Sequence, residues 1–235
     1  MVVVFGAGFA FLGVGSGGLD LGQMIQDAFG TGGSSGTSIS AAQKEVAKHP
    51  RQAAGYKTLA DAYERKGRRS DAIAALQQYA ALKPNDTGQL ERLANLQAAT
   101  ARAALADAQL AVYDEQTALA GQTFGAAPTS KFAQALADPI TAAVSAKVQR
   151  HVQETNARYQ STSTAAIATL KRVAKIRPDQ TSYFELARTA EEFGDTGSAL
   201  AAYKKLLKVS KDPATRTSIR AKIAQLQPQA PKGGG

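Results

Sequence analysis

The sequence contains no cysteine and no tryptophan, and only two histidines, His49 and His151. Without cysteine the chain forms neither disulfides nor thiolate metal sites. His151 has Glu154 one turn later, but a metal site would need further ligands at matching faces, and none is evident for either histidine. No pair of carboxylates is arranged as acid and base. We therefore expect no catalytic residue, no metal and no cofactor, and we predict that the chain is not an enzyme.

Acidic residues are fewer than basic ones: the chain has 19 Asp and Glu and 28 Lys and Arg, which gives a formal net charge of +9. Such an excess favours acidic partners, nucleic acid or anionic lipid. The basic residues are scattered, however, and their densest groups fall on amphipathic segments, which is more typical of solvated helix faces than of a nucleic-acid surface. We therefore do not expect nucleic acid as a partner. These groups are Lys171, Arg172, Lys175 and Arg177, and Lys204, Lys205, Lys208 and Lys211.

Charge is also absent from the start of the chain, where the first charged residue is Asp20. A membrane-spanning helix needs about 20 apolar residues with a basic flank, and residues 1–15 are apolar but short and unflanked. We expect the true start to lie upstream and residues 1–15 to be the end of a single-pass transmembrane helix in the lipid bilayer. Residues 16–39 form a Gly/Ser-rich linker by composition. Basic residues upstream would place the C-terminal domain on the non-cytoplasmic side.

The same segment could instead belong to a nucleotide-binding domain, because VVVFGAGFAF resembles the strand and glycine turn of a dinucleotide-binding fold. Phe11 occupies the place of the third glycine, which is needed for close helix packing. A Gly/Ser stretch follows instead of a helix and a second strand. The nucleotide-binding interpretation is therefore disfavoured.

Two segments, around Tyr56 and around Tyr183, share one pattern: an aromatic residue, Leu three residues later, a small residue, Gly, and then a small residue opening an apolar helix. Residues 52–85 and 180–212 resemble tetratricopeptide repeats. The resemblance implies helix pairs that stack on one another to bury their apolar faces. The repeat-core residues are Tyr56, Leu59, Ala60, Tyr63, Gly67, Ala72 and Pro84 in the first unit, and Tyr183, Leu186, Ala187, Gly194, Ala199 and Tyr203 in the second.

Between the two units, the first helix of a third repeat begins in register, because Leu90, Leu93 and Ala94 stand 34 residues beyond Tyr56, Leu59 and Ala60. The turn to a second helix does not follow at the usual distance. Helix breakers appear only at Gly121, Gly125, Pro128 and Pro139, and a second unbroken run follows over residues 140–176. We interpret this as one repeat whose helices extend into an antiparallel hairpin inserted at about residues 100–160, with arms of roughly 35 residues, or about 50 Å.

The fold class predicted is thus all-α: a short solenoid of antiparallel helix pairs over residues 40–226, with one pair extended, followed by a disordered tail over 227–235. We expect the arms of the hairpin to pack through apolar stripes. At the tip, Phe124 and Phe132 either cap the hairpin's own end or form an exposed docking point. The stripes are Leu93, Leu96, Leu105, Leu110, Val112 and Tyr113 on the outgoing arm and Ile140, Val144, Val148 and Val152 on the return arm.

The resemblance also implies a function, since repeats of this family bind peptides in a concave groove lined by their first helices. Asp61 stands where some members place an Asn that clamps a terminal carboxylate, so that subclass is not expected. The function predicted is a membrane-anchored scaffold that binds a protein partner, in envelope protein assembly or quality control. The alternative is a structural spacer whose hairpin forms a homo-oligomer. The groove residues are Lys57, Asp61, Glu64, Glu91, Asn95, Arg188 and Glu191.

Overall fold

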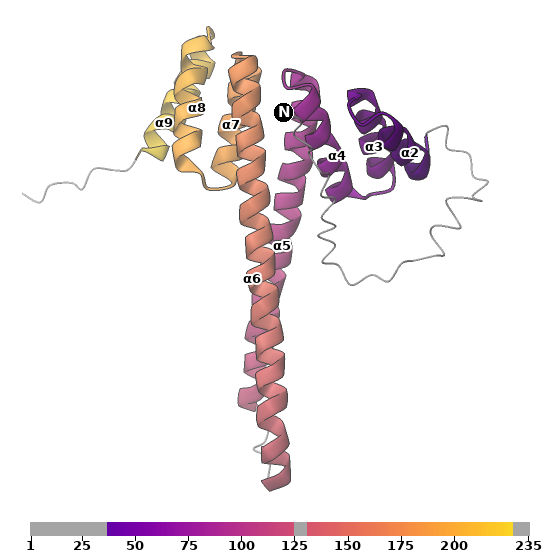
Figure 1. The fold of residues 1–235 in the computed structure, drawn as a ribbon. Helices are drawn as coiled ribbons and strands as arrows, with labels where there is room; N and C mark the ends of the chain where they lie inside the picture. The colour runs from indigo at the N-terminus through magenta and orange to yellow at the C-terminus, as the bar shows by residue number, and fades with distance from the viewer. Residues whose placement is uncertain (1–36, 125–130, 228–235) are drawn as a thin grey trace, which may run out of the picture.

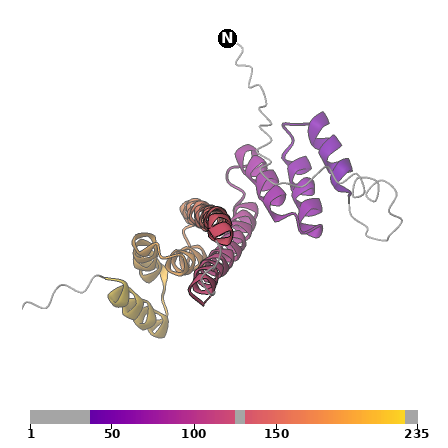
Figure 2. The ribbon, with the colours of Figure 1, turned by 90° about the horizontal axis from the view of Figure 1, so that it is seen from below.

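The computed structural model of the protein describes residues 37–124 and 131–227, and the side chains of these ranges except for 114–142 and 144. This part of the chain folds into eight helices without a strand, so the predicted all-α solenoid with one extended hairpin is confirmed. Two short stacks flank a long central hairpin that projects far beyond them (Figure 1). Seen along the hairpin, the helices form a row (Figure 2). Residues 1–15, and with them the predicted bilayer segment, lie outside the described residues.

Each repeat consists of a first and a second helix, and the row of helices begins with a second helix. The leading half-repeat is α2 (Ile39–Lys48), a second helix without its partner. The first complete pair is α3 (Ala53–Arg65) and α4 (Arg69–Leu82). The hairpin consists of α5 (Thr87–Phe124) and α6 (Lys131–Ile176). The last pair is α7 (Gln180–Glu192) and α8 (Thr196–Val209), and α9 (Pro213–Leu226) closes the row.

Local chemistry explains where these helices begin and turn. Asp179, Asp195 and Asp212 each accept a hydrogen bond from the backbone N–H three residues later, at 2.8, 2.9 and 2.7 Å. Such N-caps satisfy donors that the first turn of a helix leaves unpaired. Gly67 and Gly194 have φ of 69° and 77°, a conformation that side chains disfavour. The glycine positions of the repeat pattern are therefore required by the turn between paired helices.

Two hydrophobic cores form, one on each side of the hairpin. The N-terminal core packs α2, α3 and α4 around Leu59, Leu76 and Leu90, and it includes Val173 of α6. The C-terminal core packs α7, α8 and α9 around the second repeat, and it includes Ala94 of α5 and Leu170 of α6. Both arms of the hairpin therefore contribute to both cores. The base of the hairpin joins the two stacks into one row.

The seam between the hairpin arms consists largely of small residues. On α5, buried positions follow one another at alternating spacings of four and three, the heptad pattern of paired helices. Within this seam Thr169 donates a hydrogen bond to the oxygen of the buried Gln97 at 2.8 Å. A polar pair inside an apolar seam favours a single register between two helices. The positions in this pattern are Leu90, Ala94, Gln97, Ala101, Ala104, Ala108 and Ala111, and Leu93 and Ala98 beside them are buried as well.

The predicted leucine stripe of the outgoing arm is wrong beyond Leu96. Leu105 and Val112 are 36% and 39% exposed, and Leu110 and Tyr113 are both 63% exposed. The alanines form the seam because their small side chains let the helix axes approach closely, and this turns the larger side chains outward. On the return arm Val148 and Val152 are half-buried as expected, whereas the side chains of Ile140 and Val144 lie outside the described residues.

The prediction that Gly121 and Pro139 would end the arms is also wrong. Helix α5 continues to Phe124, and α6 begins at Lys131 and runs through Pro139. A proline within a helix removes one backbone donor and opposes one carbonyl, but the remaining hydrogen bonds of the helix stay in place. The arms are therefore longer than predicted, at 38 and 46 residues.

The alanine seam makes a stability prediction. Replacing the fully buried Ala101 by Leu inserts bulk between the arms and is expected to lower the free energy of unfolding by about 1–3 kcal/mol. The matched control is Ala103→Leu, two residues away on the exposed face, where the change is expected to stay within about 0.5 kcal/mol. Urea denaturation followed by circular dichroism measures both. Equal effects would contradict the observed seam.

Candidate functional site: the inner groove

The predicted groove residues lie on three consecutive first helices. Lys57, Asp61 and Glu64 belong to α3, Glu91 and Asn95 to α5, and Arg188 and Glu191 to α7. The long side chains of Lys57 and Arg188 are exposed, as is Asn95, whereas the four carboxylates are half-buried. We call the surface formed by the first helices α3, α5, α7 and α9 the inner groove.

The carboxylates of the inner groove are paired with cations of neighbouring helices. Asp61 and Glu64 of α3 share Arg92 of α5, with N–O distances of 2.6 and 2.7 Å. Glu91 contacts Arg177, which follows α6. The two pairs of Arg92 link α3 to the next first helix, and the pair of Glu91 and Arg177 joins the start of α5 to the end of α6 within the hairpin. Networks of this kind contribute more than isolated surface pairs. The acidic side chains therefore stabilise the stack and are not free to bind a basic ligand.

Glu191 is the most constrained of the four. It accepts hydrogen bonds from Lys222 of α9 and from the hydroxyl of Tyr203 of α8, each at 2.6 Å. The hydrogen bond from Lys222, reinforced by the one from Tyr203, holds the pKa of the Glu191 carboxyl below its ordinary value. Burial, together with the hydrogen bond to Glu191, raises the pKa of Tyr203 to about 12. Glu191 thus fastens three helices at the C-terminal end of the groove.

The cations in these pairs were missed in the sequence analysis, although a signal for two of them exists. Asp61 and Arg92 are 31 residues apart, and so are Glu191 and Lys222. In a 34-residue repeat this separation places the cation about one helical turn before the equivalent position on the next first helix. The two side chains then face each other across adjacent helices. A recurring acid–base separation slightly shorter than the repeat is therefore a usable indicator of links between repeats.

The repeat-core residues lie where the paired helices pack on one another, on the first helices α3 and α7 and on the second helices α4 and α8. Leu59, Ala60, Tyr63, Ala72, Leu186, Ala187 and Ala199 are buried, as are Tyr183 and Tyr203. Tyr56 is half-buried, and its hydroxyl donates to the carbonyl of Pro50 at 3.2 Å. Pro84 is exposed, and its carbonyl accepts a hydrogen bond from Arg172 of α6 at 2.8 Å. These two residues therefore act at the junctions between repeats.

A hollow of about 440 Å³ opens in the inner groove between α7 and α9. Phe184 lines it and is 47% exposed, the one large apolar side chain of α7 that turns to solvent. Polar side chains surround this ring, among them Gln180 of α7, Thr215 and Ser218 of α9. Phe184 and Arg188 are one turn apart on α7. The arrangement presents an apolar anchor beside hydrogen-bonding groups, which is a common feature of ligand-binding hollows.

Within the described part of the chain, no group of three or more His, Cys, Asp or Glu residues is placed to hold a metal. His49 is exposed and lies 3.8 Å from Glu45, and His151 is exposed on α6. Over the same residues, no helix combines the length and apolar character needed to cross a bilayer. The side chains of Phe124 and Phe132 lie outside the described residues, so their role stays a prediction.

Comparison with known proteins identifies the repeats. A family model described as tetratricopeptide repeat matches residues 54–86 and 181–213, so the chain contains two such repeats. Solved structures with similarity include TTC0263, a thermophilic TPR protein in Thermus thermophilus. It is 14% identical over 80% of this chain and 88% of that one, with a TM-score of 0.25. The TPR domain of P58(IPK) is 19% identical over 80% of this chain and 58% of that one, with a TM-score of 0.26. No curated protein matches.

The Glu191 contacts predict a pH dependence. Because the pKa of Glu191 is lower in the folded than in the unfolded chain, its contribution to stability is present above the unfolded pKa and is lost as the pH falls through the folded value. Glu191→Gln is expected to cost about 1–2 kcal/mol at pH 7 and to show a smaller loss of stability between pH 6 and pH 3 than the parent. Urea midpoints across this range measure the difference. Glu154→Gln, on the exposed face of α6, serves as the control, and an unchanged slope for Glu191→Gln would contradict the assignment.

Proposed function

We propose that this chain, which contains two tetratricopeptide repeats, is a membrane-anchored scaffold whose inner groove binds a segment of a protein partner. The observation that carries the proposal is the half-exposed Phe184 in the hollow between α7 and α9. A half-exposed aromatic ring at a hollow that Leu206 and Ile219 also line offers apolar surface for a partner side chain to cover. Aromatic side chains of this kind also dominate the energetics of many protein interfaces.

The charges of the inner groove specify the kind of segment that fits. Each of its four carboxylates already forms an ion pair with Arg92, Arg177 or Lys222, and this weakens their attraction for a basic segment. The exposed polar side chains that remain are Lys57, Asn95 and Arg188, of which Arg188 lies 3.0 Å from Glu185. The groove therefore suits a neutral or mildly acidic segment that places one apolar side chain on Phe184 and hydrogen-bonds through its neighbours.

The membrane anchor rests on the sequence of residues 1–15, an uncharged apolar run joined to the repeats by a Gly/Ser-rich linker. Such an arrangement would hold the groove close to the bilayer while leaving it free to reorient. A role at the bacterial envelope, in the assembly or quality control of other proteins on the non-cytoplasmic side, is the physiological setting that we propose for this scaffold.

Photo-crosslinking in cells tests the groove. An amino-acid photo-crosslinker at Gln180 is expected to capture a discrete partner, and Phe184→Ala is expected to reduce that product about tenfold or more, because a buried aromatic contact is lost. The matched control carries the crosslinker at Gln77, an exposed residue on α4 outside the groove. Equal products from Gln180 and Gln77, or indifference to Phe184→Ala, would contradict the proposed site.

Flotation in a density gradient tests the anchor. The full chain is expected to float with phosphatidylglycerol-containing vesicles, whereas the double variant Val4→Asp and Phe9→Asp is expected to remain at the bottom, because each charge at bilayer depth costs about 2.5–3.5 kcal/mol. Placing the same two charges at Gln78 and Ala81, on the outer side of α4, should leave flotation unchanged. Failure of the full chain to float would remove the anchor and leave the groove proposal standing.

A second candidate function is supported by the outward-facing apolar side chains of α5, Leu105, Leu110, Val112 and Tyr113. A second copy of the hairpin would cover them, and the protein would then act as a self-associating spacer. Under this alternative, a crosslinker at Leu105 yields the chain's own dimer as its sole product, Gln180 captures nothing, and the mass in solution falls on dilution.

A further inference from the structure

A second concave surface lies on the other side of the last repeat, where α6 and α8 pass each other above α7. A hollow of about 680 Å³ opens between the C-terminal part of α6 and α8. A neighbouring hollow of about 450 Å³ lies between α6 and the turn from α7 to α8. Lys171 lines both, so the two hollows are adjacent along α6. We call this surface the outer groove.

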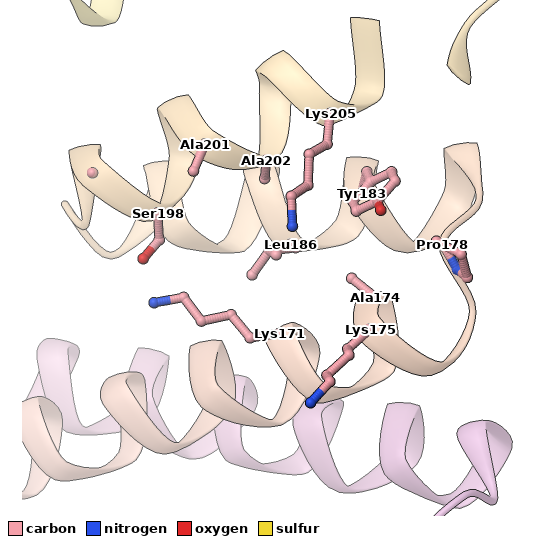
Figure 3. A pocket seen from close by; sticks show the side chains of 11 residues that line it. Lys171, Ala174, Lys175, Pro178, Tyr183, Leu186, Ser198, Ala201, Ala202 and Lys205 are labelled. Carbon is pink, nitrogen blue, oxygen red and sulfur yellow. The ribbon is translucent and has the colours of Figure 1, made fainter. Parts of the chain in front are cut away.

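The outer groove is bordered by lysines from both helices. Lys205 reaches from α8 toward α6, while Lys171 and Lys175 extend from α6 (Figure 3). Lys205 lies 5.7 Å from the centre of the Tyr183 ring, and Lys171 lies 3.8 Å from Asp195, the one carboxylate among the lining residues. Within the described part of the chain, Lys175 and Lys205 have no carboxylate partner. Each of the two helices therefore contributes one lysine without a carboxylate partner to the border of the groove, in a chain of net charge +9.

The bottom of the outer groove is apolar, and its sides carry small residues. Leu186 and Tyr183 of α7 form the floor beneath the lysines, and Ile167 of α6 continues it toward Phe193. The walls carry small side chains, among them Ala168 and Ala201, which are both exposed. Small walls over an apolar floor let the backbone of another helix approach closely.

We propose that the outer groove docks an acidic amphipathic helix of a partner protein. From Gln160 to Lys175 the groove follows α6 for about 15 residues, or about 22 Å, which matches four turns of a docked helix. Lys171 and Lys175 are one turn apart on α6, so two carboxylates four residues apart on the partner would meet them, and a third would meet Lys205. The partner's apolar face would cover Leu186 and Ile167, as helices do in apolar grooves.

This inference is independent of the inner groove, because the outer groove uses the second helices α6 and α8 and none of the residues assigned to the partner segment above. A chain with both surfaces would hold two different proteins on opposite sides of one repeat. The charge pattern distinguishes the two ligands: the carboxylates of the inner groove are all in ion pairs, whereas the outer groove has more lysines than carboxylates.

Fluorescence anisotropy with the full chain tests the proposal. The probe is a labelled 16-residue amphipathic helix with Leu and Ala on one face and Glu at four-residue intervals beside it. Its counterpart has Gln in place of Glu. The double variant Lys175→Glu and Lys205→Glu is expected to weaken binding of the Glu peptide about tenfold or more, since exposed ion pairs each contribute about two- to fivefold and reversal adds repulsion. The Gln peptide is expected to bind weakly to all forms.

Three controls make the result decisive. Lys44→Glu with Lys48→Glu, on exposed positions of α2, changes the net charge equally and is expected to leave the affinity within about twofold. Ala201→Phe blocks the outer groove without changing charge and should weaken binding, whereas Phe184→Ala should not. Equal losses in the α2 and outer-groove variants, or unchanged binding to Ala201→Phe, would overturn the proposal. Binding to phosphatidylglycerol vesicles without binding to the peptide would also overturn it, in favour of a lipid surface.

Discussion

The structure depends on the base of the α5–α6 hairpin, where one helix pair serves as part of two hydrophobic cores. Leu90 and Val173 complete the N-terminal core, and Ala94 and Leu170 of the same two helices complete the C-terminal one. A single repeat cannot bury its apolar faces alone, so each stack needs a neighbour. The hairpin provides that neighbour to both sides. The arms beyond the base are then free to be long, because the stacks require only their first few turns.

Two features give the hairpin close packing and a single register between its arms. The alanines of α5 occupy a heptad pattern of buried positions, which brings the arms close together, and the hydrogen bond between Thr169 and Gln97 favours one register. The same close approach leaves Leu105 and Val112 outside. The apolar side chains that are usual in a seam thus become a surface feature, available to a second copy or to another protein.

The position of a charged residue in the repeat does not show whether it forms an ion pair between helices or stays unpaired. Asp61, Glu64 and Glu191 lie on the groove-facing sides of the first helices, yet their partners on the next helix turn them into links between repeats. Lys175 and Lys205 lie on second helices, which are usually regarded as scaffolding, and they remain uncompensated in the described part of the chain. Binding capacity therefore follows from what is left unpaired after the repeats have stacked, and not from the repeat position alone.

The sequence by itself determined the all-α repeat class, a further first helix in register at Leu90 and the extended hairpin, because these depend on glycine turns and apolar spacing, which are local properties. Only the tertiary structure decided three things: that alanine and not leucine forms the seam, that α6 passes through Pro139, and which charges are paired. The physical reason is that α5 is apolar on more than one side, so its buried face is chosen by how closely α6 can approach. Likewise, an ion pair between helices depends on the distance between side chains that the sequence places 28 residues apart or more.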